Sequence, residues 1–138
     1  MVDIVDATTR SRMMRAIRGR DTGPEMRLRA LLHRAGFRFR LHRRDLPGRP
    51  DIVLPRHRAV VLVHGCFWHR HQDCRFAAMP ATRPDFWAAK FAANVARDGR
   101  NIADLQALGW RVAVVWECEL KADAQARADA LGCWLRQG

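Results

Sequence analysis

The segment from His64 to Cys74 constrains the fold of this chain more than any other. It carries three histidines, two cysteines and a Phe-Trp pair within eleven residues, directly after the apolar run 60–63. Neutral imidazole and thiolate are the ligands that Zn²⁺ prefers, and aromatic rings beside a basic surface can stack on nucleic-acid bases. The segment therefore predicts one loop, directly after an apolar run, in which a structural metal, an acid–base group and a nucleic-acid contact lie together.

The length and composition are typical of one globular domain. The chain has 138 residues and a hydrophobic content of 49%, enough for a core without disulfide staples. Because no run of about 18 apolar residues and no secretory leader is visible, we expect neither a membrane span nor export. Four cysteines close to histidines fit a metal site in a reducing, cytoplasmic compartment better than a disulfide framework.

The charge is strongly positive and unevenly distributed. The formal net charge is +11, and residues 1–50 hold thirteen arginines against five acidic residues. Codon bias can explain why arginine outnumbers lysine, but it does not explain the excess of base over acid. Since such a surface attracts polyanions, the charge and the aromatic residues together predict a nucleic acid as the partner.

Apolar periodicity and turn residues predict an α/β fold in which helices flank a small mixed sheet. A first helix, beginning at Thr9 or Ser11, precedes a second that Thr22 caps. We expect strands at 37–41, 51–54, 59–63 and 111–116, and helices at 22–36, 84–108 and 122–135. In the last helix, Cys133 is expected to belong to the core.

Asp51 precedes the first apolar strand of a predicted hairpin. If the turn is centred on His57, residue 51 pairs with residue 63 and residue 52 with residue 62, about 5 Å apart. The Asp51 carboxylate would then lie beside the backbone carbonyl of Val63, a pair of hard oxygen ligands suited to Mg²⁺ and to phosphodiester hydrolysis. The alternative is that Asp51 only caps its strand or pairs with Arg49.

His69 is the candidate general base, because imidazole titrates close to neutral pH. It needs an orienting carboxylate, which Asp98 can supply from the predicted helix 84–108. One face of that helix carries, at spacings of 4, 3 and 4, Trp87, Phe91, Asn94 and Asp98. The alternative is that the polar residues simply face solvent, which the two aromatic residues on the same face disfavour.

Cys66, His71 and Cys74 are spaced as three corners of a tetrahedral metal site. Cys118, just after the predicted strand 111–116, can supply the fourth corner. Three thiolates and one imidazole with no open position predict a structural Zn²⁺ site rather than a catalytic one. Alternatively, Cys66 and Cys118 are small buried hydrophobic residues.

Phe67 and Trp68 lie between a predicted zinc ligand and the candidate base. Such a pair usually belongs to a core, but the polar, metal-fixed loop around it favours partial exposure. Rings wedged between base pairs cost about a few kcal/mol of unstacking, and least at a mismatch. The pair therefore indicates a physical route to selectivity for damaged DNA.

Ordered motifs run along nearly the whole chain. They are Arg10-Ser11, Met14-Arg15-Ala16-Ile17, Thr22-x-Pro24-Glu25, Leu46-Pro47-Gly48-Arg49-Pro50-Asp51, His64-Gly65-Cys66-Phe67-Trp68-His69, Ala81-Thr82-Arg83, Phe86-Trp87, Lys90, Asn94-Val95, Arg97-Asp98, Leu108-Gly109-Trp110-Arg111-Val112 and Val115-Trp116-Glu117-Cys118. Together they resemble the very-short-patch repair (Vsr-type) mismatch endonucleases. The resemblance implies one restriction-endonuclease-like, three-layer α/β domain over 1–138, with a DNA-contacting helix at 1–20 and a nuclease core at 21–138. It also implies nicking on the 5′ side of the thymine in a T·G mismatch, which arises when 5-methylcytosine deaminates.

The resemblance further implies roles for individual residues. Those matching the family's catalytic residues are Asp51, His69, His64, Asp98 and Glu25. Those matching its structural zinc ligands are Cys66, His71, Cys74 and Cys118. Those matching its DNA contacts are Phe67, Trp68, Trp87, Lys90, Asn94 and, from the minor-groove side, Met14. Asp51 would hold Mg²⁺ with the Val63 carbonyl, and His69 would be the base.

Two departures from wider patterns matter. Nucleases of the broader superfamily carry an acid and a lysine on the strand after the Pro-Asp, whereas no Asp, Glu or Lys occurs from 52 to 72. The resemblance implies that the Vsr branch uses a backbone carbonyl and histidines in place of this acid and lysine. Their absence therefore supports assignment of the chain to the Vsr branch. Position 63 is Val where the family commonly has Thr, a change that a backbone-carbonyl role tolerates.

The sequence thus predicts a Mg²⁺-dependent, zinc-containing enzyme that nicks mismatched double-stranded DNA as a monomer in the cytoplasm, near the nucleoid. Other mismatch-repair proteins are candidate partners. The runner-up hypothesis is a non-catalytic zinc-containing DNA-binding protein, which the joint presence of Asp51, His69 and Asp98 disfavours. A third reading, a less selective nuclease of the same fold, differs mainly in substrate.

Overall fold

The computed structural model describes residues 22–138, so the predicted first helix and Met14 lie outside the described residues. The elements are α2 (Gly23–Arg34), β1 (Arg40–Leu41), β2 (Ile52–Leu54), the 3₁₀ turn η1 (Pro55–His57), β3 (Ala59–His64), the 3₁₀ turn η2 (Arg75–Ala77), α3 (Pro84–Ala107), β4 (Arg111–Trp116) and α4 (Glu117–Arg136). The strands form one mixed sheet in the order β1–β2–β3–β4, antiparallel except for the parallel pair β3–β4. The predicted α/β class and mixed sheet are confirmed.

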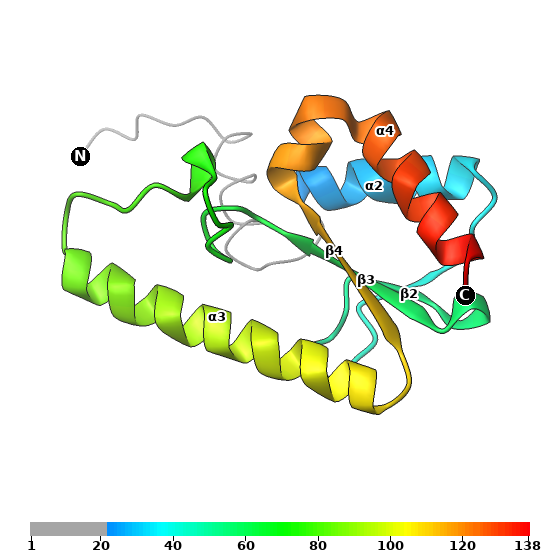
Figure 1. Cartoon of the computed structure of the whole chain (residues 1–138), viewed down its shortest axis with the longest axis horizontal. Coiled ribbons are helices and arrows are strands. Elements are labelled where there is room, and N and C mark those ends of the chain that lie inside the picture. Colours follow the sequence, from blue (N-terminus) through cyan, green and yellow to red (C-terminus); the bar gives the residue numbers. More distant parts are fainter. Residues whose placement is uncertain (1–21) are drawn as a thin grey trace, which may run out of the picture.

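Helices cover both faces of the sheet. Helices α2 and α4 lie on one face, and α3 crosses the other (Figure 1). The alternation of side chains along β3 explains this, because Val61 faces the α2–α4 core and Val60 faces α3. The main apolar contacts of α2 and α4 are Leu28, Leu32, Leu131 and Leu135. The sheet is thus buried on both sides, and the restriction-endonuclease-like assignment stays a prediction.

The β2–β3 hairpin differs by one residue from its predicted register. Ile52 pairs with Val61, whereas the sequence prediction paired residue 52 with residue 62. The turn is the cause: a 3₁₀ turn begins at Pro55, and Arg58 adopts a left-handed φ of 46°. Four residues therefore connect the strands instead of five, and Asp51 no longer lies opposite Val63 in the ladder.

The predicted strand 37–41 is shorter than expected. Only Arg40–Leu41 pairs with β2. The preceding residues complete the end of α2 instead, with Gly36 at a φ of 97° and the Phe37 N–H donating to the Leu32 carbonyl at 3.0 Å. Phe37 is buried in the core beside that helix, an apolar contact typical of such helix ends.

The closing helix begins earlier than the predicted range 122–135. It starts at Glu117, where the Trp116 N–H donates to Glu119 Oε1 at 2.8 Å. Asp123 is non-helical, and its carboxylate accepts from the Ala126 N–H at 3.0 Å. The expected helix is the part after this break, since Asp123 acts as its cap. No helix within residues 22–138 combines the length and the apolar character needed to cross a membrane.

Cys133 is exposed on α4, contrary to the expected core position. The buried stripe of this helix passes through Leu131 and Leu135. Because Cys133 lies two positions from each, about 200° around the helix, it faces away from the core.

The core between α3 and the sheet is small, which makes Leu105 a sensitive position. Leu105 is fully buried against Val53 and Val60. We expect Leu105→Ala to lower the free energy of unfolding by about 2–5 kcal/mol, because few neighbours can close the cavity. Urea denaturation measures the effect. Leu108→Ala, at the C-cap of the same helix but 54% exposed, is the control and should change stability by less than about 0.5 kcal/mol.

Candidate active site and metal centre

A cleft of about 1320 Å³ opens where β3 ends, beside the N-terminus of α2 and the middle of α3. Most of the predicted catalytic and DNA-contacting residues line it: Asp51, Val63, His64, His69, Asp98, Phe67, Trp68, Lys90 and Asn94. Glu25 and Trp87 contact residues of this lining, Asp51 and Phe67 respectively. Segments far apart in the sequence therefore meet at one concave site.

Asp51 is held at the mouth of the β2–β3 hairpin. Its Oδ2 accepts a hydrogen bond from the Val63 N–H at 2.8 Å, so the two residues meet although they are not paired in the ladder. Burial raises the pKa of Asp51 to about 7; the Val63 hydrogen bond opposes this rise, and the nearby Glu25 carboxylate adds to it. A cation beside Asp51 would stabilise the ionised form of its carboxylate in this buried environment.

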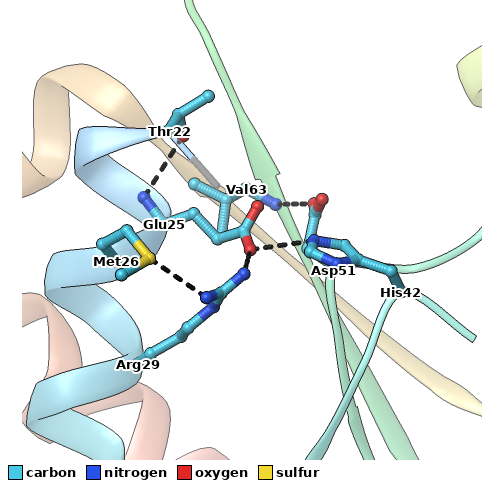
Figure 2. Close-up of polar contacts among 7 residues, drawn as sticks. All are labelled: Thr22, Glu25, Met26, Arg29, His42, Asp51 and Val63. Atoms are coloured by element: carbon cyan, nitrogen blue, oxygen red, sulfur yellow. Dashed lines mark hydrogen bonds and ion pairs between the residues drawn. The ribbon is translucent and has the colours of Figure 1, made fainter. Parts of the chain in front are cut away.

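Glu25 reaches the site from the first turn of α2, where the Thr22 side chain caps the helix by accepting from the Glu25 N–H at 3.4 Å. The Glu25 side chain is buried, forms an ion pair with Arg29 and lies 2.9 Å from His42 Nε2 (Figure 2). Three potential metal-binding side chains, those of Glu25, His42 and Asp51, thus gather at one point.

His69 and Asp98 form the pair that the sequence predicted. His69 Nδ1 lies 2.6 Å from Asp98 Oδ2, and both side chains are mostly buried. The ring of His64 stacks on that of His69 with centroids 3.8 Å apart and planes at 4°. Burial lowers the pKa of His64 to about 4, and the neighbouring His69 adds to this, so His64 is neutral at physiological pH. The His69–Asp98 pair can therefore accept a proton while the neighbouring His64 stays uncharged.

Helix α3 presents the predicted face to the loop after β3. Asp98 contacts His69, and Asn94 Nδ2 donates to the Trp68 carbonyl at 3.2 Å. The aromatic positions of this face, Trp87 and Phe91, both contact Phe67, at centroid distances of 5.8 Å and 5.1 Å. The spacings of 4, 3 and 4 thus place all four side chains on the site.

Phe67 and Trp68 are half-buried, as the sequence predicted for a loop held from one side. Their rings are 5.1 Å apart at 88°. Arg70 supports them: its guanidinium lies over the Phe91 ring at 4.0 Å and donates to the carbonyls of Phe67 and Ala77. Phe67 and Trp68, which we call the aromatic edge, are therefore held in place from one side and still line the cleft.

The four predicted zinc ligands come together in a second site. The ligand atoms of Cys66, His71, Cys74 and Cys118 lie within 4.8 Å of one another. His71 Nδ1 is 3.3 Å from Cys118 Sγ and 3.7 Å from Cys66 Sγ, near the separations of about 3.5–3.8 Å expected for tetrahedral zinc. The donor set fits a closed metal site. Burial raises the pKa of Cys66 to about 12, so its thiolate needs a cation.

The sequence prediction missed His42 and Arg70. His42 follows β1 and has a left-handed φ of 47°, so no periodic pattern places its ring. It is 17 residues from Glu25, and only the β1–β2 pairing brings it beside Asp51. Arg70 resembles any other residue of a basic loop until its carbonyl and ring contacts are known.

Comparisons with known proteins show which sequences this chain is similar to. The family described as DNA mismatch endonuclease Vsr matches residues 2–75. DNA mismatch endonuclease Vsr of Escherichia coli (strain K12) is 50% identical over 131 residues, covering 95% of this chain and 83% of that protein. The type II nicking enzyme V.XorIIP of Xanthomonas oryzae pv. oryzae is 54% identical over 120 residues, covering 87% and 88%. The type II nicking enzyme V.NmeAIP of Neisseria meningitidis is 42% identical over 127 residues, covering 92% and 90%.

The cysteine cluster gives a prediction about bound metal. We expect the purified chain to carry about one zinc ion, and Cys118→Ser to lose most of it and several kcal/mol of stability. Mass spectrometry of the metal content and thermal unfolding measure both effects. Cys133→Ser is the matched control, because Cys133 is exposed and outside the cluster. Full zinc retention by Cys118→Ser would contradict the predicted ligand set.

The raised pKa of Asp51 gives a prediction about stability. The folded pKa of about 7 exceeds the usual value of 3.8 for an Asp, so the stability that protonated Asp51 retains at low pH is lost as the pH rises from 3.8 to about 7. Without added Mg²⁺, Asp51→Asn should be more stable than the wild type by about 2–4 kcal/mol at pH 8, with little difference near pH 4. Urea denaturation at both pH values measures this. Asp104→Asn, an exposed change on α3, controls for general charge effects. Equal stability at pH 8 would show that burial of Asp51 carries no cost.

Proposed function

This chain belongs to the Vsr family of DNA mismatch endonucleases, and on that premise we propose that it nicks one strand of duplex DNA on the 5′ side of the thymine in a T·G mismatch. The observation that carries the proposal is the hydrogen-bonded His69–Asp98 pair, which lies in the same cleft as Asp51 and next to half-buried aromatic rings. A proton acceptor, a carboxylate for a cation and a stacking surface are the three parts that such a reaction needs.

His69 is the general base of the proposed reaction. Its Nδ1 is engaged by Asp98, which leaves Nε2 to take the proton of the attacking water. As the water oxygen bonds to phosphorus, the bond from phosphorus to the leaving sugar oxygen breaks. The Asp98 carboxylate stabilises the imidazolium that forms and fixes the orientation of the ring. His64, neutral and stacked on His69, can contact a phosphate oxygen without adding charge next to the base.

Asp51 and the backbone carbonyl of Val63 would hold Mg²⁺. The donor set fits, since both groups are hard oxygens at the cleft wall and Asp51 is a buried carboxylate whose charge is incompletely balanced. A bound Mg²⁺ supplies stabilisation of the negative charge on the transferring phosphoryl group. Glu25 lies beside Asp51, where its carboxylate can contact the ion directly or through one of its waters.

The aromatic edge supports selectivity for mismatches. Phe67 and Trp68 face the cleft beside Lys90 and Asn94, and Trp87 packs on Phe67 from α3. Inserting these rings costs unstacking of about a few kcal/mol, and that cost is lowest where the base pair is already weak. Zn²⁺ in the Cys66–Cys118 cluster, together with Arg70, would hold the rings rigid for this purpose. The net charge of +11 supports duplex DNA as the partner.

The proposed function predicts strand-specific cutting. With Mg²⁺, the wild type should nick the thymine strand of a T·G duplex and leave the matched T·A duplex largely intact. Asp51→Ala should abolish nicking, and His69→Ala should reduce the single-turnover rate by about 10²–10⁴-fold because the general base is lost. Denaturing electrophoresis of end-labelled strands measures both.

The matched control is His33→Ala, an exposed histidine at the far end of α2, which should nick as the wild type does. Retained binding of the T·G duplex by the inactive variants separates catalysis from affinity. Equal cutting of matched and mismatched duplexes would contradict the mismatch assignment and favour a less selective nuclease. Binding without cutting by the wild type across several divalent ions would favour a non-catalytic DNA-binding protein.

A further inference from the structure

We infer that the metal site at Asp51 has a third side-chain ligand, His42, and that this two-carboxylate, one-imidazole site prefers first-row transition-metal ions such as Mn²⁺ to Mg²⁺. The inference rests on the proposed role of Asp51 as the metal-binding carboxylate and deepens it. It concerns which ion this chain selects and which residue makes the selection.

The geometry of the three side chains carries the inference. Glu25 comes from the first turn of α2, His42 from the residue after β1, and Asp51 from the residue before β2. One ligand atom of each lies within 4.8 Å of those of the other two, and His42 Nε2 is 2.9 Å from Glu25 Oε2. Figure 2 shows the Glu25 carboxylate and the His42 ring converging beside Asp51. A cation between them could take an atom of each, replacing the hydrogen bond between His42 and Glu25.

The backbone of His42 is arranged to bring its ring there. The His42 N–H donates to the Asp51 carbonyl at 3.2 Å, which continues the β1–β2 ladder by one bond. The residue then turns into the left-handed region with a φ of 47°. That conformation costs a non-glycine residue about 1–2 kcal/mol, and such costs concentrate at functional sites. Within residues 22–138 the ring contacts Glu25, so the turn serves this cluster.

The charge of the cluster calls for a cation. Glu25 and Asp51 are two carboxylates brought together out of water, and the ion pair with Arg29 compensates that of Glu25. The charge of Asp51 is offset in part by the Val63 N–H, which donates to it at 2.8 Å, and by the nearby Arg29 charge. Two carboxylates and one guanidinium leave a negative charge in the cluster, which a divalent ion at this point would neutralise.

The imidazole decides the preference among ions. Mg²⁺ strongly favours oxygen ligands and keeps most of its waters, so a nitrogen ligand adds little to its binding. First-row transition metals bind imidazole well, with affinity rising from Mn²⁺ to Cu²⁺. The other histidine cluster next to the cleft, His64, His69 and Asp98, is less suited, because its two rings stack face to face at 3.8 Å and Asp98 already bonds His69.

The experiment measures Mn²⁺ binding to the zinc-loaded full chain without DNA. Titration followed by electron paramagnetic resonance gives the affinity, competition with Mg²⁺ gives the preference, and electron spin echo modulation detects a bound ¹⁴N. The wild type should show one Mn²⁺ with histidine nitrogen coupling. His42→Gln should lose the coupling and bind Mn²⁺ about 10-fold or more weakly, with Mg²⁺ affinity nearly unchanged.

His42→Gln is informative because glutamine can still donate to Glu25. A merely structural hydrogen bond would survive the change, and the ratio of Mn²⁺ to Mg²⁺ affinity would stay as in the wild type, which would overturn the inference. Nitrogen coupling that persists in His42→Gln would also overturn it by placing Mn²⁺ on the His64–His69 cluster. His33→Gln, an exposed histidine on α2, is the matched control and should bind as the wild type.

Asp51→Asn separates this inference from the proposed function. Mn²⁺ binding that needs Asp51 but not His42 would overturn the role of His42 and leave the proposed site intact. Mn²⁺ binding that does not need Asp51 would contradict the proposed metal site itself, and the inference with it.

Discussion

The parallel pairing of β3 with β4 is the constraint on which both candidate sites depend. It aligns His64 with Trp116 at the ends of the two strands, so the loop that leaves β3 and the helix that follows β4 begin at the same edge of the sheet. Cys118, in the first turn of α4, donates its N–H to Cys66 Sγ at 3.4 Å. Helix N-termini stabilise negative charge, so the strand pairing delivers both a ligand and a favourable field to the thiolates.

The crowded loop after β3 can serve two purposes because its side chains alternate between two neighbourhoods. Cys66 and His71 turn toward α4 and Trp116, with the His71 ring stacked on that tryptophan at 4.1 Å. Phe67 and His69 turn toward α3, where Phe67 packs against Phe91 and His69 is hydrogen-bonded to Asp98. A metal bound by the cysteine cluster on one side would therefore fix the orientation of the rings on the other side. Rigidity of this kind keeps reacting groups within the small tolerance that proton transfer requires.

The sequence predicted the parts of the site that lie within one periodic element or one dense motif. The 4, 3 and 4 spacing on α3 and the cysteine and histidine spacing after β3 correctly identified the residues that meet. The hairpin register could not be predicted in the same way, since β2 is fully buried and alternation marks neither of its faces. The left-handed turn at Arg58 decided the register. His42 escaped detection for a related reason: its place depends on a left-handed φ and on pairing across the sheet.

The two clusters differ in how their charge is balanced, and this difference keeps them chemically distinct. The cysteine cluster is closed, with four soft donors and a helix N-terminus beside them, and thiolates exclude a hard ion such as Mg²⁺. The cluster around Asp51 has two carboxylates and one imidazole, and Asp51 lies at the wall of an open cleft, so a phosphate could complete the coordination of an ion there. Burying two carboxylates side by side in this cluster lowers the stability of the fold. A neutral residue at one of the two positions would remove this cost, so the joint presence of the two carboxylates is typical of a site that serves binding or catalysis.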